Sequence, residues 1–194
     1  MKAIGVLALQ GDWAAHSTVL RELGAEVRTV RTAEELADVG ALVIPGGESS
    51  AVLRLMEPED LGGRIVARIR AGMPVLATCA GVILLAQTVV PTQPSLGALG
   101  VDVERNAYGR QLYSTVEEID LATDLGEPQQ MEAVFIRAPR IIRRDASVEV
   151  LGTWGEDAVL VRQGRVLAAT FHPELTIDRR VHDLFLHIEE DDNG

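Results

Sequence analysis

"PVLATCAGVILLA", residues 74–86, places the chain's one cysteine, Cys79, between two apolar runs. The run at 74–78 is short and almost entirely apolar, which predicts a strand buried on both faces. The apolar run at 80–90 is longer and predicts a helix. A reactive residue at the sharp turn between a strand and a helix, flanked by small residues, has the form of a nucleophile elbow. Cys79 is therefore a candidate nucleophile, although free cysteine is also common as a packing residue in protein cores.

Upstream of this stretch, apolar strand-like runs alternate with segments of helical spacing. Strands are predicted at 3–9, 25–30 and 41–47, and helices at 14–23, at 32–39 and, in one or two pieces, from 48 to 72. Thr32, with Glu35 three residues later, matches a capping box at the start of the second helix. Strands that alternate with helices in this way form a parallel sheet with helices on both faces.

Downstream of Pro91 the pattern changes to shorter strand-like runs separated by turn residues. These runs lie at 97–105, 111–119, 131–138, 147–154, 157–163 and 164–171, and an amphipathic helix is predicted at about 177–189. Hairpin-like turns at 155–158 and 162–165 indicate antiparallel pairing. The sequence therefore predicts an α/β fold whose second half is mixed.

The composition fits one folded domain over residues 1–194, with a solvated acidic tail at about 189–194. Of the 194 residues, 47% are hydrophobic and 24% are charged, which is enough apolar character for a sizeable core. The net charge of −11 argues against nucleic acid and anionic membranes as partners. No apolar run is long enough to span a membrane, and the start of the chain does not resemble a secretory signal. One cysteine forms no internal disulfide and no Cys/His cluster has zinc spacing, so we expect a cytoplasmic protein without a metal.

A thiol nucleophile requires a base, and the base requires a group that orients it. His172 follows the apolar strand predicted at 164–171 and so lies at the carboxyl edge of the sheet, where Cys79 also lies. Glu174 comes two residues later, and Pro173 stiffens the link between them. The sequence therefore predicts that Cys79, His172 and Glu174 meet, although a histidine at a strand end is by itself an ordinary feature.

Six short blocks carry a family resemblance. They are LALQGD (7–12), PGGESS (45–50), TCAGVILLA (78–86), VERNAYGRQ (103–111), FIRAP (135–139) and TFHPELT (170–176). TCAG, PGGES and FHPE resemble the class I (triad) glutamine amidotransferases. The six blocks in this order are similar to the family of glutaminase subunits of pyridoxal 5′-phosphate synthase. Three small departures are Ala77, where glycine is frequent, Ser50, where threonine is usual, and Ala15, where an acid is common.

The resemblance implies a flavodoxin-like three-layer fold with a mostly parallel central sheet and helices on both faces. It implies hydrolysis of L-glutamine to L-glutamate and ammonia, with Cys79 as nucleophile, His172 as base and Glu174 as the orienting acid. The backbone N–H groups of Gly47 and Ala80 are expected to hold the oxyanion. No metal or organic cofactor is implied.

The resemblance also implies a binding site for the α-carboxylate and α-ammonium groups of glutamine. The residues expected around them are Gly47, Glu48, Ser49, Arg105, Ile136 and Arg137. Arginine suits a carboxylate because its guanidinium forms paired, charge-assisted contacts, although most arginines are solvated surface charges.

Three further histidines and one glutamine lie outside the residues expected at the catalytic and substrate sites. Gln10 and His16 lie in or after the LALQGD block and are expected to face a partner protein, with a plain loop role as the alternative. His182 and His187 lie on the last predicted helix and are expected to be solvated.

Ammonia needs protection from bulk water, because at neutral pH it becomes ammonium, which is a poor nucleophile. The resemblance accordingly implies a partner, a TIM-barrel synthase subunit in a large hetero-oligomer that builds pyridoxal 5′-phosphate. Three alternatives remain open. They are a glutaminase that serves another synthase, such as imidazole glycerol phosphate synthase, a cysteine peptidase or stress protein on a related sheet, and a non-catalytic binding subunit.

Overall fold

The computed structural model describes residues 2–108, 114–122, 125 and 129–188. The helices are α1 (Trp13–Glu22), α2 (Ala33–Ala37), α3 (Ser49–Met56), α4 (Leu61–Arg70), α5 (Ala80–Leu85) and α6 (Arg180–His187), with the 3₁₀ turns η1 (Glu57–Glu59) and η3 (Pro173–Leu175). The strands are β1 (Ile4–Leu7), β2 (Val27–Val30), β3 (Ala41–Ile44), β4 (Val75–Thr78), β5 (Ala86–Val90), β6 (Leu99–Glu104), β7 (Ser114–Leu121), β8 (Gln130–Ile136), β9 (Arg140–Arg144), β10 (Glu149–Trp154), β11 (Asp157–Gln163) and β12 (Val166–Ala169). The acidic tail at 189–194 and the start of the strand predicted at 111–119 lie outside the described residues.

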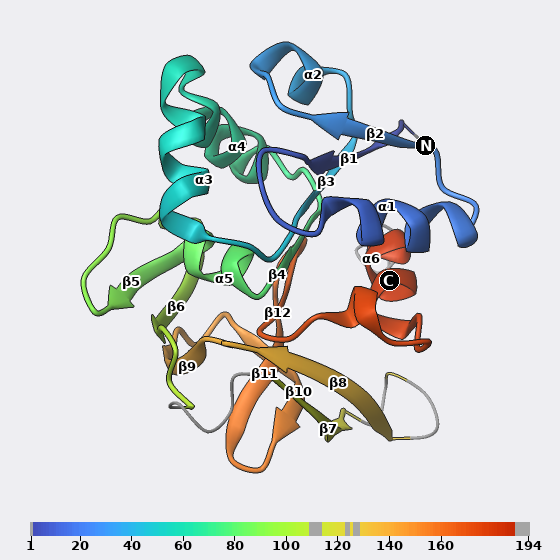
Figure 1. Ribbon diagram of the computed structural model, residues 1–194, viewed down its shortest axis with the longest axis vertical. Coiled ribbons are helices and arrows are strands. Elements are labelled where there is room, and N and C mark those ends of the chain that lie inside the picture. Colours follow the sequence, from blue (N-terminus) through green and yellow to red (C-terminus); the bar gives the residue numbers. More distant parts are fainter. Residues whose placement is uncertain (1, 109–113, 123–124, 126–128, 189–194) are drawn as a thin grey trace.

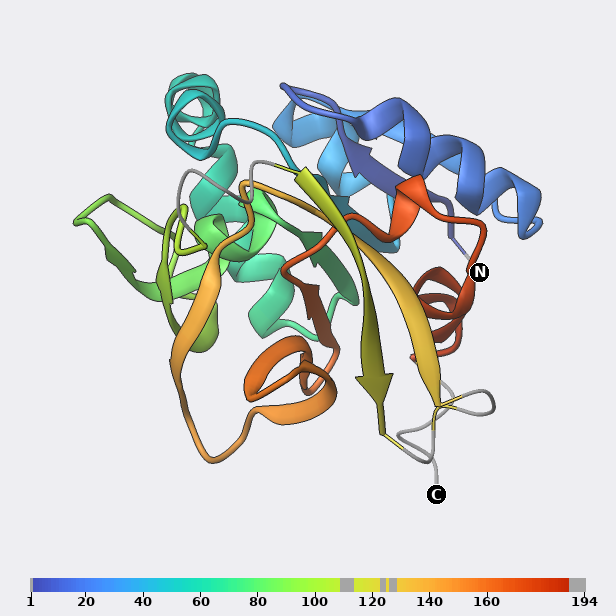
Figure 2. The same ribbon diagram turned by 60° about the horizontal axis from the view of Figure 1, so that its bottom comes forward.

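A nine-stranded sheet has the order β2-β1-β3-β4-β12-β11-β10-β7-β8. The pairs from β2 to β12 are parallel, and those from β12 to β8 are antiparallel. Figure 2 shows β7 and β8 running side by side in the antiparallel part. The α/β fold with a mixed second half is thus confirmed. Because β4 and β12 are parallel neighbours, the chain leaves both strands at the same edge of the sheet.

Successive residues of the parallel strands face opposite helix layers, as the pleat of a strand requires. In β3, Leu42 and Ile44 pack in the cluster that includes side chains of α3, α4 and α5, whereas Val43 packs in the cluster of α1 and α6. Figure 1 shows the same division, with α1 and α6 on one face of the sheet and α3, α4 and α5 on the other. Burial of each such side chain stabilises the fold by about 1.5–3 kcal/mol, which fixes the register of the strands.

The helix expected at 80–90 is shorter than its apolar run indicates. α5 ends at Leu85, and residues 86–90 form β5 instead, which pairs in parallel with β6. Thr88, Val89 and Val90 are β-branched, and such side chains fit a pleated surface better than a helix. The prediction of one helix over 80–90 was therefore wrong for its second half.

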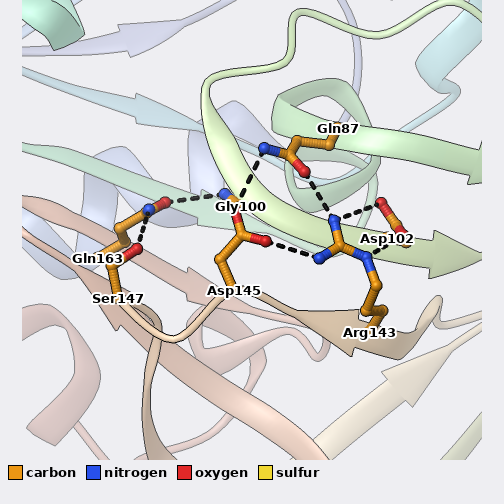
Figure 3. A network of polar contacts seen from close by, with 7 residues as sticks. All are labelled: Gln87, Gly100, Asp102, Arg143, Asp145, Ser147 and Gln163. Atoms are coloured by element: carbon orange, nitrogen blue, oxygen red, sulfur yellow. Dashed lines mark hydrogen bonds and ion pairs between the residues drawn. The ribbon is translucent and has the colours of Figure 1, made fainter.

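A second, three-stranded sheet with the order β5-β6-β9 is held by a polar network (Figure 3). Arg143 of β9 donates hydrogen bonds to Asp102 of β6, to Gln87 of β5 and to Asp145. β9 was not predicted, because its sequence RIIRR has little apolar character. Its pairing with β6 and these charge-assisted contacts give it the strand conformation instead.

The same network connects the small sheet to the large one. Gln163 of β11 accepts a hydrogen bond from the Gly100 N–H at 2.8 Å and donates one to Ser147 at 2.8 Å. Arg105 directly follows β6, and its N–H donates to the Val90 carbonyl at 2.7 Å. The small sheet thereby fixes the position of Arg105 relative to the large sheet.

The ends of several elements differ little from the prediction. The capping box of α2 is formed, with the Thr32 hydroxyl accepting from the Glu35 N–H and the Glu35 carboxylate accepting from the Thr32 N–H. The last helix begins at Arg180, three residues later than expected.

Within the described ranges, no helix combines the length and the apolar character needed to cross a bilayer.

Candidate active site

Cys79 occupies a strained turn between β4 and α5. Its φ of 45° and ψ of −105° lie outside the regions that a residue with a Cβ normally adopts. The Cys79 N–H donates to the Ala169 carbonyl of β12 at 2.8 Å, which helps to hold this conformation. A side chain on Gly81 would lie 2.3 Å from the Ile44 carbonyl oxygen, so only glycine allows α5 to start this close to β3. Strain of this kind costs about 1–3 kcal/mol and persists mainly at functional sites.

β12 and η3 bring the two other predicted residues to this turn. The register pairs Ala169 with Thr78, so His172 leaves β12 close to Cys79. The His172 N–H donates to the Val134 carbonyl at 2.8 Å, and the ring Nδ1 lies 2.7 Å from Glu174 Oε1. Both side chains are buried, and the Glu174 side chain is fully so. The structure thus brings Cys79, His172 and Glu174 together in this order, and we call this arrangement the catalytic line.

Gly46 leaves the space that this arrangement needs. A Cβ at Gly46 would lie 2.5 Å from Cε1 of His172 and 3.3 Å from Cβ of Cys79. The turn after β3 therefore approaches both the thiol and the imidazole, and a side chain at this position would displace one of them.

Two opposing effects act on the pKa of His172. Burial lowers the pKa, but the hydrogen bond with Cys79, then the hydrogen bond with Glu174 and the negative charges of both groups, raise it to about 10. His172 is thus protonated at neutral pH whenever Cys79 is a thiolate. In the thiol form, Sγ lies 3.6 Å from the Ile136 carbonyl oxygen and donates to it.

A cleft of about 250 Å³ opens in front of Cys79 and His172. All the predicted substrate and oxyanion residues line it, namely Gly47, Glu48, Ser49, Ala80, Arg105, Ile136 and Arg137. Asp12, Ile83, Asn106 and Leu175 also line it and were not predicted. The cleft is smaller than sites for drug-sized ligands, which measure about 300–1,000 Å³, and suits a metabolite the size of an amino acid.

Backbone strain is concentrated around this cleft. Among the described residues, the non-glycine residues with positive φ are Asp60, Cys79, Asn106 and Arg137, and the last three line the cleft. Asn106 and Arg137 follow β6 and β8, respectively, at values of 51° and 46°. Unusual backbone angles at three separate segments that meet in one cleft support a functional role for it.

The lining of the cleft combines two carboxylates, Asp12 and Glu48, with the guanidinium groups of Arg105 and Arg137. The hydrogen bond from the Ser50 hydroxyl, followed by the Ser50 N–H and the charges of Arg105 and Arg137, lowers the pKa of Glu48 against the opposing effect of burial. Arg105 lies 4.0 Å from Glu48 and also donates to the Gln93 side chain. Glu48 is thus ionised at neutral pH beside two fixed positive charges.

Gln93 supports two residues of the cleft although no motif marked it. Its side chain exchanges hydrogen bonds with the Ser49 hydroxyl, at 3.0 and 3.2 Å, and accepts one from Arg105. Gln93 lies in the loop after β5, where the sequence shows only turn residues. Its proximity to two predicted residues could not be read from the sequence, because it depends on where β5 and the small sheet lie.

Gln10 and His16 have different environments. Gln10 is exposed, and its Oε1 accepts a hydrogen bond from the Glu48 N–H at 2.6 Å, so it supports the turn that carries Gly47. His16 is 0% exposed and points into the protein from α1, so the expectation that it faces a partner is wrong. His182 is also 0% exposed, against the prediction that it is solvated, whereas His187 is exposed as predicted.

Comparisons of the sequence with known proteins identify its family. The model of the SNO glutamine amidotransferase family matches residues 6–190. The chain is 47% identical over 186 residues to pyridoxal 5′-phosphate synthase subunit PdxT of Thermosipho africanus, covering 95% of this chain and 97% of the relative. It is 51% identical over 192 residues to the subunit of the same name from Koribacter versatilis, covering 98% and 97%.

Solved structures of similar proteins have the same fold as this chain. One described as the crystal structure of glutamine amidotransferase is 44% identical, has a TM-score of 0.90, and covers 97% of this chain and 99% of its own. The structure of PurLQS from Thermotoga maritima, at 16% identity, has a TM-score of 0.70 over 96% of this chain and 99% of its own. The second similarity concerns the fold alone.

Proposed function

Because this chain belongs to the SNO glutamine amidotransferase family, we propose that it is the glutaminase subunit of a pyridoxal 5′-phosphate synthase. It hydrolyses the side-chain amide of L-glutamine and delivers the ammonia to a synthase subunit. The observation that carries this proposal is the line of Cys79, His172 and Glu174 at the base of a cleft that has charged groups of both signs on its rim.

The first half of the reaction forms a thioester. The Cys79 thiolate attacks the side-chain amide carbon of glutamine, and the carbonyl electron pair moves onto the oxygen. His172, which holds the thiol proton, gives it to the leaving nitrogen, and ammonia departs. Glu174 accepts the His172 Nδ1–H at 2.7 Å, so the other ring nitrogen faces the reacting atoms.

The second half releases glutamate. His172, now neutral, takes a proton from a water molecule, and the resulting hydroxide attacks the thioester carbon. The C–S bond breaks, glutamate leaves, and the Cys79 thiolate and protonated His172 are restored. In both halves, the N–H groups of Gly47 and Ala80 stabilise the oxyanion. Each such donor is worth about 10²–10³ in rate.

Recognition of the α-carbon end of glutamine requires both signs of charge. Arg105 and Arg137 in the cleft suit the α-carboxylate, and the ionised Glu48 beside them suits the α-ammonium group. Ser49 and Ile136 complete the walls of the cleft. This arrangement distinguishes free glutamine from a glutamine within a peptide, which lacks both end charges.

Arg137→Ala should raise the KM for glutamine while kcat changes little. The loss of a hydrogen bond to a charged group costs about 1.5–3 kcal/mol, which corresponds to roughly tenfold to a hundredfold in KM. The measurement is steady-state kinetics of glutamate release. Arg28→Ala is the control, since Arg28 is an exposed arginine of β2 that pairs with Glu26 away from the cleft. Equal kinetics for the two variants would remove Arg137 from the substrate site.

A synthase subunit is the natural partner because the relatives' names describe subunits of a pyridoxal 5′-phosphate synthase. We propose a TIM-barrel subunit in a large hetero-oligomer, through which ammonia passes without contact with bulk water. Gln10 lies on the exposed side of the Gly47 turn and is a candidate contact for this partner. A reduced thiol is required for catalysis, so we place the assembly in the cytoplasm, where thiols remain reduced.

The assembled complex should be a much better glutaminase than the isolated chain. Gly47 has a φ of 152°, a conformation that favours glycine, and its turn can present the N–H in more than one orientation. Docking of a synthase at this edge would fix the productive orientation. The experiment compares glutamate release by the purified chain alone and with a synthase subunit, which should also co-purify with it. Full activity of the isolated chain, unchanged by the synthase, would contradict the proposed partner.

A further inference from the structure

A buried polar chain continues behind the triad, away from the cleft. His16 of α1 lies between Glu174 and His182 of α6, and all three side chains are buried. His16 Nε2 is 3.2 Å from Glu174 Oε2, and His16 Nδ1 is 2.9 Å from His182 Nε2. Figure 1 shows α1 and α6 close together on the same face of the sheet, which explains how residues 166 positions apart meet.

Both histidines are neutral at physiological pH. Burial, followed by the charges of His182 and His172, lowers the pKa of His16 well below its ordinary value. Burial, followed by the charge of Arg179, lowers the pKa of His182 to about 4. A neutral imidazole has one N–H and one lone pair, so each ring must choose which nitrogen carries the hydrogen.

The second oxygen of Glu174 determines this choice for His16. Oε2 is buried, and within the described residues it has no well-aligned hydrogen-bond donor. His16 Nε2 forms a hydrogen bond with the Thr78 hydroxyl at 3.1 Å and lies 3.2 Å from Oε2, so a hydrogen on Nε2 also places partial positive charge beside this oxygen. With the hydrogen on Nδ1 instead, a nitrogen lone pair would face a carboxylate oxygen in a dry environment, which is unfavourable.

His182 then has only one tautomer that satisfies its neighbour. If His16 carries its hydrogen on Nε2, its Nδ1 is an acceptor, and His182 Nε2–H must donate to it. This leaves His182 Nδ1 as a bare lone pair. In the described part of the chain, that atom has no hydrogen-bond partner. A buried weak acceptor without a partner costs less free energy than a buried N–H without one. All donors in the chain therefore point toward the triad.

We propose that His16 is a positioning residue for Glu174, and that His182 acts through it by fixing its tautomer. This inference rests on the proposed glutaminase function. The partial positive charge of the His16 N–H lies 3.2 Å from Oε2 of Glu174, so that Oε1 remains directed at His172 and the carboxylate does not rotate. His16 touches neither substrate nor Cys79, and its effect is on kcat through the orientation of the imidazole.

Two substitutions at His16 separate this role from simple packing. His16→Leu removes the donor and should lower kcat by about ten- to a hundredfold, the range found when partners that orient metal ligands are removed, with little change in KM. His16→Gln keeps an amide N–H near the position of Nε2 and should recover most of the loss. His187→Gln on α6 is the control, because His187 is 54% exposed and should be replaceable without effect. Equal kcat for His16→Leu and the wild type would overturn the proposal.

The tautomers can be measured without any substitution and without activity. ¹⁵N NMR of the histidine-labelled full chain should show His16 and His182 as neutral rings with the hydrogen on Nε2. His182→Phe should then shift the His16 signals, because the donor to Nδ1 is lost. A hydrogen on Nδ1 of His16 in the wild type would overturn the proposal even if the protein is a glutaminase. Conversely, the expected tautomers in a chain that shows no glutaminase activity even with the synthase subunit would leave the positioning geometry intact and reject the proposed function.

Discussion

Cys79→Ala is expected to reduce glutamine hydrolysis to background. The substitution removes the atom that forms the thioester, and loss of a nucleophile in a triad costs on the order of 10⁶ in kcat. Alanine fits the buried position, so the variant should fold and melt within a few degrees of the wild type. The measurement is glutamate release in the complex with the synthase, with thermal melting as the test of folding.

The same variant has an internal positive control. The complex containing Cys79→Ala should still make product when an ammonium salt replaces glutamine, because the synthase active site is unchanged. Substantial hydrolysis of glutamine by a folded Cys79→Ala variant would show that the nucleophile is another group. Loss of product formation with ammonium would instead indicate that the substitution has disrupted the complex.

Glu174→Gln should lower kcat by up to about 10⁴, with less effect if solvent can take over part of the role. The glutamine amide accepts a hydrogen bond but carries no charge to stabilise the imidazolium, and its NH₂ group favours the wrong tautomer of His172. The Glu174 side chain is fully buried, so solvent replaces little of it. The control is Glu26→Gln, at an exposed carboxylate that is 65% accessible and pairs with Arg28.

Glu174→Gln should also shift the pH dependence of kcat in one direction. Cys79 and, after it, Glu174 raise the pKa of His172 to about 10, against the effect of burial. Loss of the Glu174 charge lowers that pKa, so His172 in the variant loses its proton at a lower pH than in the wild type. Because the protonated ring donates to the leaving ammonia, the alkaline limb of kcat should move to lower pH. A folded variant with the wild-type kcat and profile would leave a Cys79–His172 dyad.

The large sheet and the catalytic line could be predicted because both follow from local patterns. Residues 74–78 are buried on both faces of a parallel strand, as their apolar run indicates, and they deliver Cys79 to the carboxyl edge. The strand before His172 does the same at the next position in the sheet. Two adjacent parallel strands that end in reactive residues are sufficient to predict that those residues meet.

The features that were predicted wrongly from the sequence depend on contacts between distant segments of the chain. Residues 86–90 read as the end of an apolar helix, because an apolar run alone does not distinguish a buried helix from a strand. Pairing with β6 makes residues 86–90 a strand, and the local sequence pattern does not reveal that β6 pairs with them. His182 was expected to be solvated on an amphipathic helix, and His16 was expected to face a partner protein because it follows the LALQGD block. Packing of α1 and α6 on one face of the sheet buries both.

The most direct test of the account is the site of covalent labelling by a diazoketone analogue of glutamine. The analogue carries the α-carboxylate and α-ammonium groups of glutamine and alkylates the nucleophile that attacks its carbonyl. The complex with the synthase is incubated with the analogue, digested and mapped by mass spectrometry, with and without excess glutamine. We predict one label per chain, on Cys79, with a rate that glutamine decreases. Labelling elsewhere, or labelling of Cys79 that glutamine does not slow, would contradict the assignment of this cleft as a glutaminase site.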